Sequence, residues 1–299
     1  MRQLTCILGD SFPKYVIRTD IEAFYESIKT EDLLKTIDSD AFLTLPSRRM
    51  IRQILAEYQN LPGKPTGLPR GVGISAYLSE LYMRKFDEHV RAQPAIIFYA
   101  RYVDDIILVF SPEPNSSVTE FLPFVRGEAA ALGLTLNAAK TFEYDVNGTT
   151  AFECEYLGYK IRFGHGAIKV GLSDKRKLKY ERRIIRSFET YRRRSHVEER
   201  KARRLLIGRI KFLTGNTRLR NNKENILVGS FFSNSLISDP DELKSLDDIL
   251  KAETATIGSA SLRARIGKHS FQNGFTQRSF HKFSTRELSR IVKAWKHEA

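Results

Sequence analysis

The stretch FYARYVDDIILVF, residues Phe98–Phe110, places two adjacent aspartates between two apolar runs. Runs rich in β-branched and aromatic residues predict a buried strand on each side of a short turn. A carboxylate that leaves water loses hydration free energy, and two neighbouring carboxylates also repel each other. Asp104 and Asp105 therefore need a compensating group, and Mg²⁺, which prefers carboxylate oxygens, would supply it.

A third carboxylate follows another predicted strand near the start of the chain. Asp20 ends the apolar run in YVIRTDIEAFY and is followed by Ile21 and further aromatic residues. Two-metal phosphoryl-transfer sites hold ions about 3.5–4 Å apart and use a carboxylate that bridges them. Asp20 would fill this role if the end of its strand lies beside the tip of the Asp104–Asp105 hairpin, as in a sheet with packed helices.

Strand and helix patterns alternate in the first half of the chain. The spacing of apolar residues predicts helices over SRRMIRQILAEYQ, ISAYLSELYMRKFDEHV and SSVTEFLPFVRGEAAALGL, with a Gly/Pro loop at GLPRGVG. CEYLGYKIRFGHGAIKVGL is typical of a hairpin that turns at Gly164-His165-Gly166. From Ser173, a suitable N-cap, the pattern becomes helical and strongly basic. Residues 240–299 form a mixed-charge helical region with a polar interruption.

Positive charge is concentrated in one segment. The chain of 299 residues carries a net charge of +14, whereas residues 1–150 hold 16 basic and 19 acidic side chains. Residues 175–220 alone hold 18 basic and 4 acidic side chains. Such a zone is typical of a protein that binds a polyanion, most often nucleic acid, by phosphate contacts that do not read sequence and weaken with salt. The change in composition near residue 173 is the predicted domain boundary.

Composition excludes several other classes of protein. The hydrophobic fraction of 41% indicates a globular chain. No apolar run approaches the ~20 residues that a membrane span needs, and the first ten residues lack the apolar core of a signal peptide. We therefore expect a cytoplasmic protein with no membrane partner. Cys6 and Cys154 are too few for a disulfide framework or a cysteine zinc site.

Five stretches in order make the chain resemble reverse transcriptases. FYARYVDDIILVF resembles the family's Tyr-x-Asp-Asp hairpin, and RTDIEAFYESI resembles its first palm motif. GLPRGVGISAYLSELYM, GLTLNAAKT and EYLGYKI resemble the second, fourth and fifth motifs, the last being the primer grip. The motifs span about residues 14–163. The resemblance implies an α+β fold, with an antiparallel palm sheet and packed helices over residues 1–172 and a basic helical thumb and C-terminal region over residues 173–299.

The resemblance also assigns roles to individual residues. Asp20, Asp104 and the backbone carbonyl of Ile21 would hold two Mg²⁺ ions, with Mn²⁺ as the alternative ion and Asp105 in a supporting role. Lys140 would approach the leaving pyrophosphate as a further catalytic group. Nucleotide contacts would come from Tyr25, as the steric gate against a ribose 2′-hydroxyl, and from Arg70 and Gly71. The primer would lie against Tyr102, Tyr156, Leu157 and Gly158.

The basic segment would then contact nucleic acid. The residues of this segment assigned to nucleic-acid binding are Lys175, Arg176, Lys179, Arg182, Arg183, Arg186, Arg203 and Arg204. The expected partners are an RNA template or structured RNA, the DNA product and deoxynucleoside triphosphates.

Each role has a plainer interpretation. Asp20 could cap a turn, and Asp104–Asp105 could be a solvated hairpin tip, because aspartate suits turns. Tyr25 could belong to the core. Lys140, Arg70 and part of the basic segment could be ordinary solvated charges.

Two departures from the family pattern matter. Arg70 stands before Gly71 where most relatives carry glutamine. Its charge could bind the triphosphate or alter the selection of the nucleotide that pairs with the template. In addition, 19 residues precede Asp20, where relatives carry a fingers region. We expect that region to be missing or truncated, with a protein partner that supplies the fingers as one explanation.

Three functions remain open at this point. The first is an RNA-directed DNA polymerase of the bacterial defence-associated or abortive-infection branch, working with a dedicated RNA. The second is a template-independent or protein-primed DNA polymerase of the abortive-infection type. The third is a non-catalytic palm–thumb protein that binds RNA or a partner. The three aspartates argue against the third, because a binding module has no need to gather them.

Overall fold

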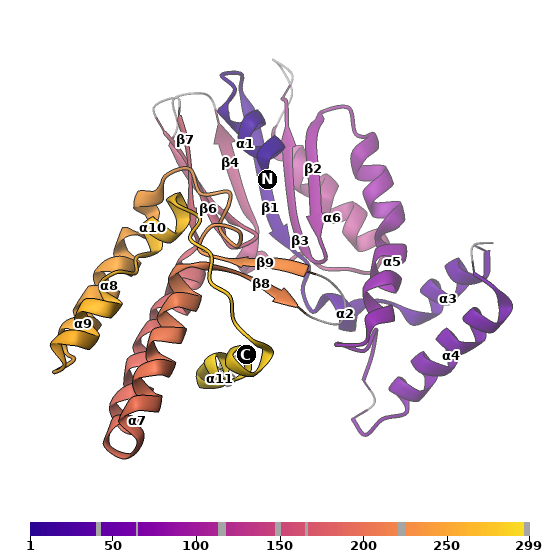
Figure 1. The fold of residues 1–299 in the computed structure, drawn as a ribbon. Helices are drawn as coiled ribbons and strands as arrows, with labels where there is room; N and C mark the ends of the chain where they lie inside the picture. The colour runs from indigo at the N-terminus through magenta and orange to yellow at the C-terminus, as the bar shows by residue number, and fades with distance from the viewer. Residues whose placement is uncertain are drawn as a thin grey trace. The chain divides into compact units, whose positions relative to one another are not determined.

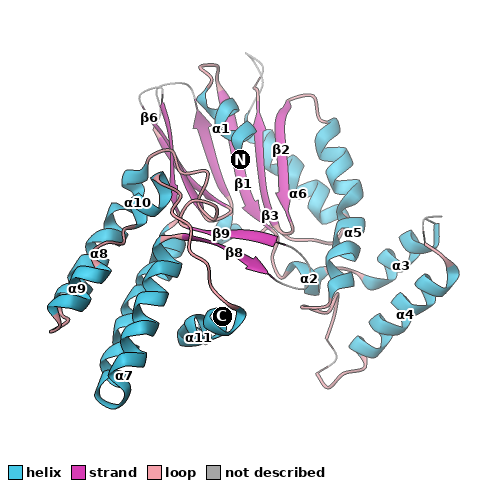
Figure 2. Ribbon diagram, in the orientation of Figure 1, coloured by secondary structure: helices cyan, strands magenta, loops and turns pink. Residues whose placement is uncertain are grey.

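The computed structural model describes residues 1–39, 43–63, 65–112, 118–146, 151–164, 167–220 and 225–295. The chain forms two compact units, coloured along the sequence in Figure 1 and by secondary structure in Figure 2. The N-terminal unit contains residues 3–157 and 163–167, and the C-terminal unit contains residues 1–2, 158–162 and 168–299.

The N-terminal unit is built on a four-stranded antiparallel sheet in the order β2-β3-β1-β4. The strands are β1 (Lys14–Asp20), β2 (Ile96–Tyr102), β3 (Asp105–Phe110) and β4 (Phe142–Val146). Strand β1 is central, and its register places Asp20 opposite Asp105 at its end. The two stretches predicted as strands from their apolar runs therefore lie side by side (Figure 1).

Helices complete this unit. They are α1 (Arg2–Gly9), α2 (Phe24–Ser27), α3 (Thr30–Ser39), α4 (Leu45–Gln59), α5 (Gly73–Ala92) and α6 (Phe121–Ala131). Alternate side chains of β3, Ile106, Leu108 and Phe110, share one core with α5 and α6. Phe110 stacks on Phe121 with ring centroids 4.2 Å apart. Each such buried side chain contributes about 1.5–3 kcal/mol, so the strand that follows the aspartates is firmly anchored.

The Gly/Pro loop that precedes α5 packs closely on α2. Leu68 N donates to Tyr25 O at 2.8 Å, and Thr66 Oγ1 donates to Glu26 O at 3.1 Å. Gly67 has φ +71°, and a Cβ atom at this position would lie 2.0 Å from Tyr25 O. Glycine is therefore required here for two reasons, the left-handed backbone and the close approach of a second chain segment.

A three-stranded sheet has the order β5-β6-β7. Its residues are shared between the two units. Its strands are β5 (Phe152–Tyr156), β6 (Tyr159–Gly164) and β7 (Ala167–Leu172). The predicted hairpin between β6 and β7 is present, and its turn residues His165 and Gly166 lie outside the described residues. A second turn, at Leu157-Gly158, joins β5 to β6.

The C-terminal unit is dominated by α7 (Asp174–Thr214), which begins at the predicted N-cap. Ser173 Oγ accepts a hydrogen bond from Arg176 N. At Glu198 the backbone leaves the helical region (φ −134°, ψ 63°) and α7 turns back into two neighbouring arms, visible in Figure 1. Ile184 and Phe188 of the first arm share a core with Leu206 and Ile210 of the second.

Shorter elements pack on α7. They are the strands β8 (Asn216–Arg220) and β9 (Asn225–Gly229) and the helices α8 (Lys244–Ala255), α9 (Ala260–Ile266), α10 (Phe271–Thr276) and α11 (Thr285–Val292). The polar interruption predicted at KHSFQNGFTQRS, Lys268–Ser279, contains a short helix, α10. There the buried Asp247 of α8 accepts hydrogen bonds from Phe271 N and Gln272 N at 2.6 and 3.1 Å. A negative charge at a helix N-terminus is stabilising, so Asp247 ties α10 to α8.

The predicted α+β fold is confirmed, with an antiparallel sheet, packed helices and a basic helical region after it. The boundary between residues 172 and 173 stays a prediction, and α7 begins beside it, at Asp174. None of the described helices has both the length and the apolar character that crossing a bilayer requires.

The loop at Gly67 provides a test of this packing. Gly67→Ala combines a left-handed backbone with the clash against Tyr25 O, whereas a Cβ atom added at Gly71 (φ +79°) would meet nothing within 4 Å, so Gly71→Ala serves as a matched control. We expect Gly71→Ala to lower the free energy of unfolding by about 1 kcal/mol and Gly67→Ala by roughly 3 kcal/mol or more. Urea unfolding measures both. Equal losses would show that the loop does not depend on this contact.

Candidate active site

Asp20 is placed at the centre of the site by the end of β1. Its carbonyl accepts a hydrogen bond from Asn137 N at 2.8 Å, and the next residue, Ile21, donates from its N to Asp104 O at 3.1 Å. The residue is 8% exposed. Because Asp20 faces Asp105 across the ladder, the side chains of the two residues lie on the same face of the sheet. The three predicted carboxylate residues are thus brought together by main-chain contacts.

The tight turn between β2 and β3 holds the two adjacent aspartates. Val103 adopts φ +60°, a left-handed conformation that a β-branched residue rarely takes. Strain of this kind costs on the order of 1–3 kcal/mol and persists only where the surroundings enforce it. Asp104, next in the chain, is half-buried. The turn thus fixes the backbone that carries both carboxylates.

A buried arginine enforces that turn. Arg101 Nη1 donates to Val103 O at 3.0 Å, and the Arg101 side chain is only 4% exposed. Its guanidinium also pairs with Glu80 and Asp87 of α5 at 2.8 and 2.7 Å. Burial alone would lower the pKa of Arg101, but the hydrogen bonds to Asp87 and Glu80 outweigh it and raise that pKa. The hairpin is therefore braced against α5 by a charged network.

Asp105 lies in a crowded electrostatic setting. Burial raises the pKa of its carboxyl group. Arg18 and a hydrogen bond from the Leu157 backbone oppose this shift, whereas the charges of Asp20 and Asp104 add to it. Arg18 Nη2 lies 3.1 Å from Asp105 Oδ1, but among the described residues neither Asp105 Oδ1 nor Arg18 Nε has a hydrogen-bond partner. The site thus contains more carboxylate charge than its own cations satisfy.

Lys140 compensates the charge of Asp20. Its Nζ lies 2.9 Å from Asp20 Oδ1, and 52% of the lysine side chain is exposed. The residue ends a short 3₁₀ turn, Ala138–Lys140, which the side chain of Asn137 caps by accepting a hydrogen bond from Ala139 N. Lys140 therefore reaches the candidate site from solvent, where it can meet an anionic ligand.

The residues present fit a divalent cation chemically. Asp20, Asp104 and Asp105 offer hard oxygen donors. Asp105 Oδ1 is paired with Arg18 but accepts no hydrogen bond from the described residues. In the described part of the chain, however, no group of three or more His, Cys, Asp or Glu side chains is arranged as a formed metal-ligand cluster. Lys140 and Arg18 stand at two of the carboxylates instead.

The predicted nucleotide contacts gather around α2 and the loop packed on it. Arg70 Nε and Nη2 donate to Glu26 Oε1 and Oε2 at 2.6 and 2.8 Å, and the guanidinium carbon lies 5.9 Å from the Tyr25 ring centroid. The hydrogen bond from Arg70 lowers the pKa of Glu26. The same hydrogen bond raises the pKa of Arg70, and the charge of Asp104 adds a smaller contribution. Tyr25 is half-buried and Gly71 is exposed. Of this set, Arg70 lies within electrostatic reach of the hairpin.

The predicted primer contacts differ in exposure. Tyr102, opposite Asp105 in the ladder, is 64% exposed. Tyr156 is buried, and its hydroxyl donates to Ala100 O at 3.4 Å. Leu157 and Gly158 form a turn with φ +50° and +75°. Tyr156 thus supports β2 from within the fold, whereas Tyr102 and Leu157 present side-chain surface to solvent.

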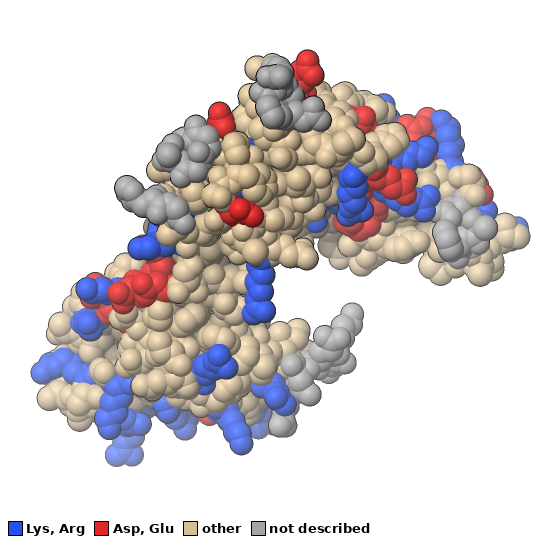
Figure 3. Space-filling model, turned by 90° about the horizontal axis from the view of Figure 1, so that it is seen from above, with Lys and Arg blue, Asp and Glu red and all other residues tan. Residues whose placement is uncertain are grey.

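The predicted nucleic-acid contacts are also not equivalent. Lys175, Lys179, Arg182 and Arg204 are exposed. The guanidinium of Arg176 lies 4.9 Å from the Tyr159 ring centroid, and that of Arg183 lies 5.5 Å from the Trp295 ring centroid. Arg203 pairs with Glu199 at 2.5 Å. Figure 3 shows Lys and Arg side chains, in blue, gathered over the helical C-terminal unit at the lower left.

Three residues that contribute to the site were not predicted from the sequence: Arg18, Arg101 and Glu26. Arg18 precedes Asp20 by two positions in a strand, so strand periodicity alone predicts that the two share a face. Arg101 carried a weaker signal, a charge inside an otherwise apolar strand. Glu26 carried none, because its partner Arg70 is 44 residues away.

Comparisons with known proteins place this geometry in a family. The profile of the family described as reverse transcriptase (RNA-dependent DNA polymerase) matches residues 8–161. No curated protein sequence matches the chain.

Solved structures with a similar chain trace include telomerases. Apo telomerase from Candida tropicalis has 15% identity and a TM-score of 0.45, covering 98% of this chain and 50% of that chain. Telomerase from Candida albicans, in complex with the TWJ fragment of telomeric RNA, has 11% identity and a TM-score of 0.45, covering 90% and 53%. The chain spans between 37% and 53% of the telomerase chains compared.

The family profile covers more than half of the sequence and includes all three aspartates of the site. The chain belongs to the reverse transcriptase family.

Proposed function

We propose that this chain is an RNA-directed DNA polymerase that adds deoxynucleotides to a primer 3′-hydroxyl group. The observation that carries the proposal is the register that sets Asp20 opposite Asp105, next to Asp104, within the segment matched by the reverse transcriptase profile. In the reaction, the primer 3′ oxygen forms a bond to the α-phosphorus of the triphosphate, and pyrophosphate leaves.

The carboxylates would hold the metal cofactor. Asp20, Asp104 and the carbonyl of Ile21 would bind two Mg²⁺ ions, with Asp105 in support. When bound, these ions would stabilise negative charge on the attacking and leaving oxygens. The braced turn at Val103 keeps the carboxylates in one position, which matters because small displacements of positioned groups reduce rates strongly. Lys140, now 2.9 Å from Asp20 Oδ1, would turn to the leaving pyrophosphate.

The loop and α2 would receive the nucleotide. Tyr25 would pack under the sugar and exclude a 2′-hydroxyl group by sterics. Arg70 is exposed and bidentate with Glu26; guanidinium groups bind phosphate with the same fork geometry. We propose that Arg70 exchanges Glu26 for the triphosphate.

The finer assignments rest on the sequence. Arg70 in place of the usual glutamine is the feature that favours the bacterial defence-associated branch, acting with a dedicated RNA. The exposed basic residues of α7 would bind phosphates of the template or product. A protein partner could add the contacts to template and triphosphate that relatives make through their fingers region.

A polymerase assay tests the function directly. The purified chain is incubated with Mg²⁺ and deoxynucleoside triphosphates, with and without an RNA template and primer. Copying of the template supports the proposal. A product whose sequence is independent of the template supports a template-independent polymerase instead. Arg70, which stands where most relatives carry glutamine, keeps this alternative open. RNA binding without product would contradict both.

Asp104→Asn should abolish synthesis, because the amide removes a negative charge from the metal-binding oxygens, and should leave RNA binding intact. Asp32→Asn is the control, since Asp32 is exposed on α3 and pairs only with Lys35 among the described residues. Primer extension and RNA filter binding measure the two properties. Synthesis retained by Asp104→Asn would overturn the metal assignment.

Arg70→Gln should raise the KM for deoxynucleoside triphosphates by about tenfold or more, because a hydrogen bond to a charged group contributes roughly 1.5–3 kcal/mol. Glu26→Gln is the matched variant, since it frees Arg70 from its carboxylate partner. Steady-state kinetics should show the KM unchanged or lower for Glu26→Gln. If both variants raise the KM equally, Arg70 serves only to hold Glu26 and the loop.

Tyr25→Ala should admit ribonucleotides, whereas Tyr25→Phe keeps the ring and should still exclude them. The measurement is the ratio of kcat/KM for a deoxynucleotide to that for the matching ribonucleotide. We expect this ratio to fall by about tenfold or more for Tyr25→Ala alone, since one lost steric contact is worth roughly 1–3 kcal/mol in discrimination. An unchanged ratio would place Tyr25 in the core rather than in the gate.

A further inference from the structure

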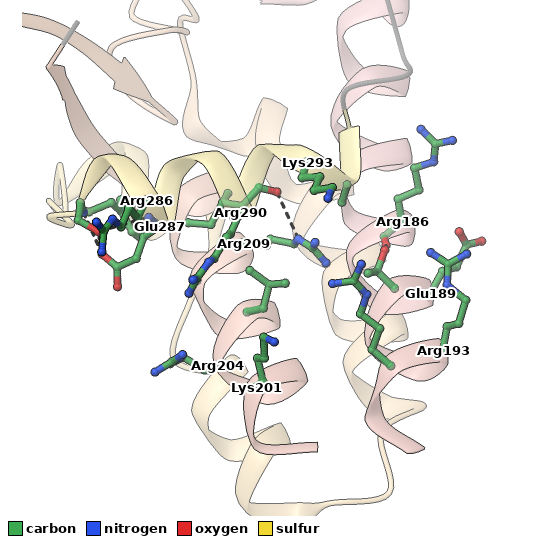
Figure 4. A pocket seen from close by; sticks show the side chains of 18 residues that line it. Arg186, Glu189, Arg193, Lys201, Arg204, Arg209, Arg286, Glu287, Arg290 and Lys293 are labelled. Atoms are coloured by element: carbon green, nitrogen blue, oxygen red, sulfur yellow. Dashed lines mark hydrogen bonds between the residues drawn. The ribbon is translucent and has the colours of Figure 1, made fainter. Parts of the chain in front are cut away.

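A large pocket lies within the C-terminal unit, between the two arms of α7 and α11 (Figure 4). Its volume is about 1010 Å³, at the upper end of the usual range for small-molecule sites, roughly 300–1,000 Å³. Its walls come from this unit alone. The pocket is therefore a feature separate from the carboxylate site of the N-terminal unit.

The pocket is lined by nine cationic and two acidic side chains. One of the two acids, Glu287, already serves the N-terminus of α11, where its Oε2 accepts hydrogen bonds from Ser284 N and Oγ, both at 2.9 Å. Figure 4 shows Arg204 and Lys201 from one arm of α7, Arg186 from the other, and Arg290 from α11 around the same space. Like charges repel, so such a wall is stabilised by an anionic ligand.

Arg209 distinguishes this pocket from an exposed basic surface, because its charge is buried. It lines the pocket yet is only 3% exposed, and its Nε donates to Ile291 O at 3.3 Å. Among the described residues, no carboxylate lies within ion-pair distance of its guanidinium. Burial lowers the pKa of Arg209 to about 10, and the charge of Arg194 adds to that shift. A buried cation without a counter-ion is strongly unfavourable, which indicates that an anion completes this site.

The lining also indicates which kind of anion fits. Guanidinium groups bind phosphate in bidentate geometry, and several of them here converge from the helical hairpin of α7 and from α11. Phe283 is the single aromatic side chain among the described lining residues, and its ring lies against Phe212 with centroids 6.1 Å apart. Recognition of bases normally needs exposed aromatic platforms. The pocket is thus suited to phosphate groups rather than to bases.

We propose that this pocket binds a ligand with two or more closely spaced phosphate groups, with Arg209 at its base. The phosphates can belong to a free polyphosphate anion or to the backbone of a nucleic acid strand. The proposal rests on the pocket and does not depend on the polymerase reaction or on its metal site.

Titration calorimetry of the whole chain tests the proposal, with sodium tripolyphosphate as one probe and a single-stranded RNA as the other. Arg209→Gln removes the buried charge while its amide can still donate to Ile291 O. Arg286→Gln with Arg290→Gln removes two exposed charges of the pocket and leaves the core untouched. The matched control is Arg200→Gln, an exposed arginine of α7 outside the pocket.

We expect tripolyphosphate to bind the unmodified chain, and both pocket variants to weaken it by about tenfold or more, the usual effect of losing a charge-assisted contact. Arg200→Gln should change the affinity less than about twofold, as expected for one exposed charge outside the site. If Arg209→Gln fails to fold, the double variant decides by the same criterion. If the pocket binds free polyphosphate, the pocket variants should keep the RNA affinity of the unmodified chain. If instead the chain does not bind tripolyphosphate and the pocket variants lose RNA affinity, the pocket binds the backbone of a nucleic acid.

Two results would overturn the proposal. One is that neither probe binds the unmodified chain. The other is that Arg200→Gln weakens binding as much as the pocket variants do, which would show attraction to the overall charge only. Asp104→Asn shows whether the two proposals are independent. If this variant loses synthesis but binds tripolyphosphate with unchanged affinity, the pocket acts independently of the polymerase site.

Discussion

The structure of the candidate active site depends on one constraint, the register that sets Asp20 opposite Asp105. Burial raises the pKa of Asp105, and the charge of Asp20 on the same face of the sheet adds to this shift. Arg18 and Lys140 each approach one carboxylate and offset part of this negative charge. Three carboxylates thus face two cations, and we propose that a divalent cation supplies the remaining positive charge.

That constraint explains the buried charge behind the hairpin. A turn with Val103 at φ +60° would relax if it were free, and the carboxylates would separate. Arg101 prevents this by holding Val103 O while its guanidinium is fixed on α5 by Glu80 and Asp87. The apolar strand β3 anchors the other side of the turn in the core. Strain, ion pairs and packing thus act together to keep the acidic face rigid.

Sequence patterns predicted those parts of the fold that depend on neighbours along the chain. Apolar runs located β1 and β3, and the N-cap at Ser173 marked the start of α7. Five ordered motifs, read as a resemblance, brought Asp20 to the hairpin. The bracing by Arg101 and the Glu26–Arg70 pair were missed, because they join residues from separate elements. The reversal at Glu198 was also missed, since RRRSHVEER contains neither glycine nor proline to mark it.

The reversal changes the meaning of the basic segment. Read as one continuous helix, its charges would form stripes along a rod, and every exposed arginine would be an equivalent phosphate contact. Folded back at Glu198, the segment encloses Arg209 beside α11. Arg176 and Arg183 of the first arm lie over the rings of Tyr159 and Trp295. Basic residues that follow one another in the sequence therefore have different roles. Some make structural contacts, some lie on the exposed surface, and some line the pocket. We therefore propose two kinds of anion binding for this segment, one diffuse and sensitive to salt on the exposed surface and one in the pocket around Arg209.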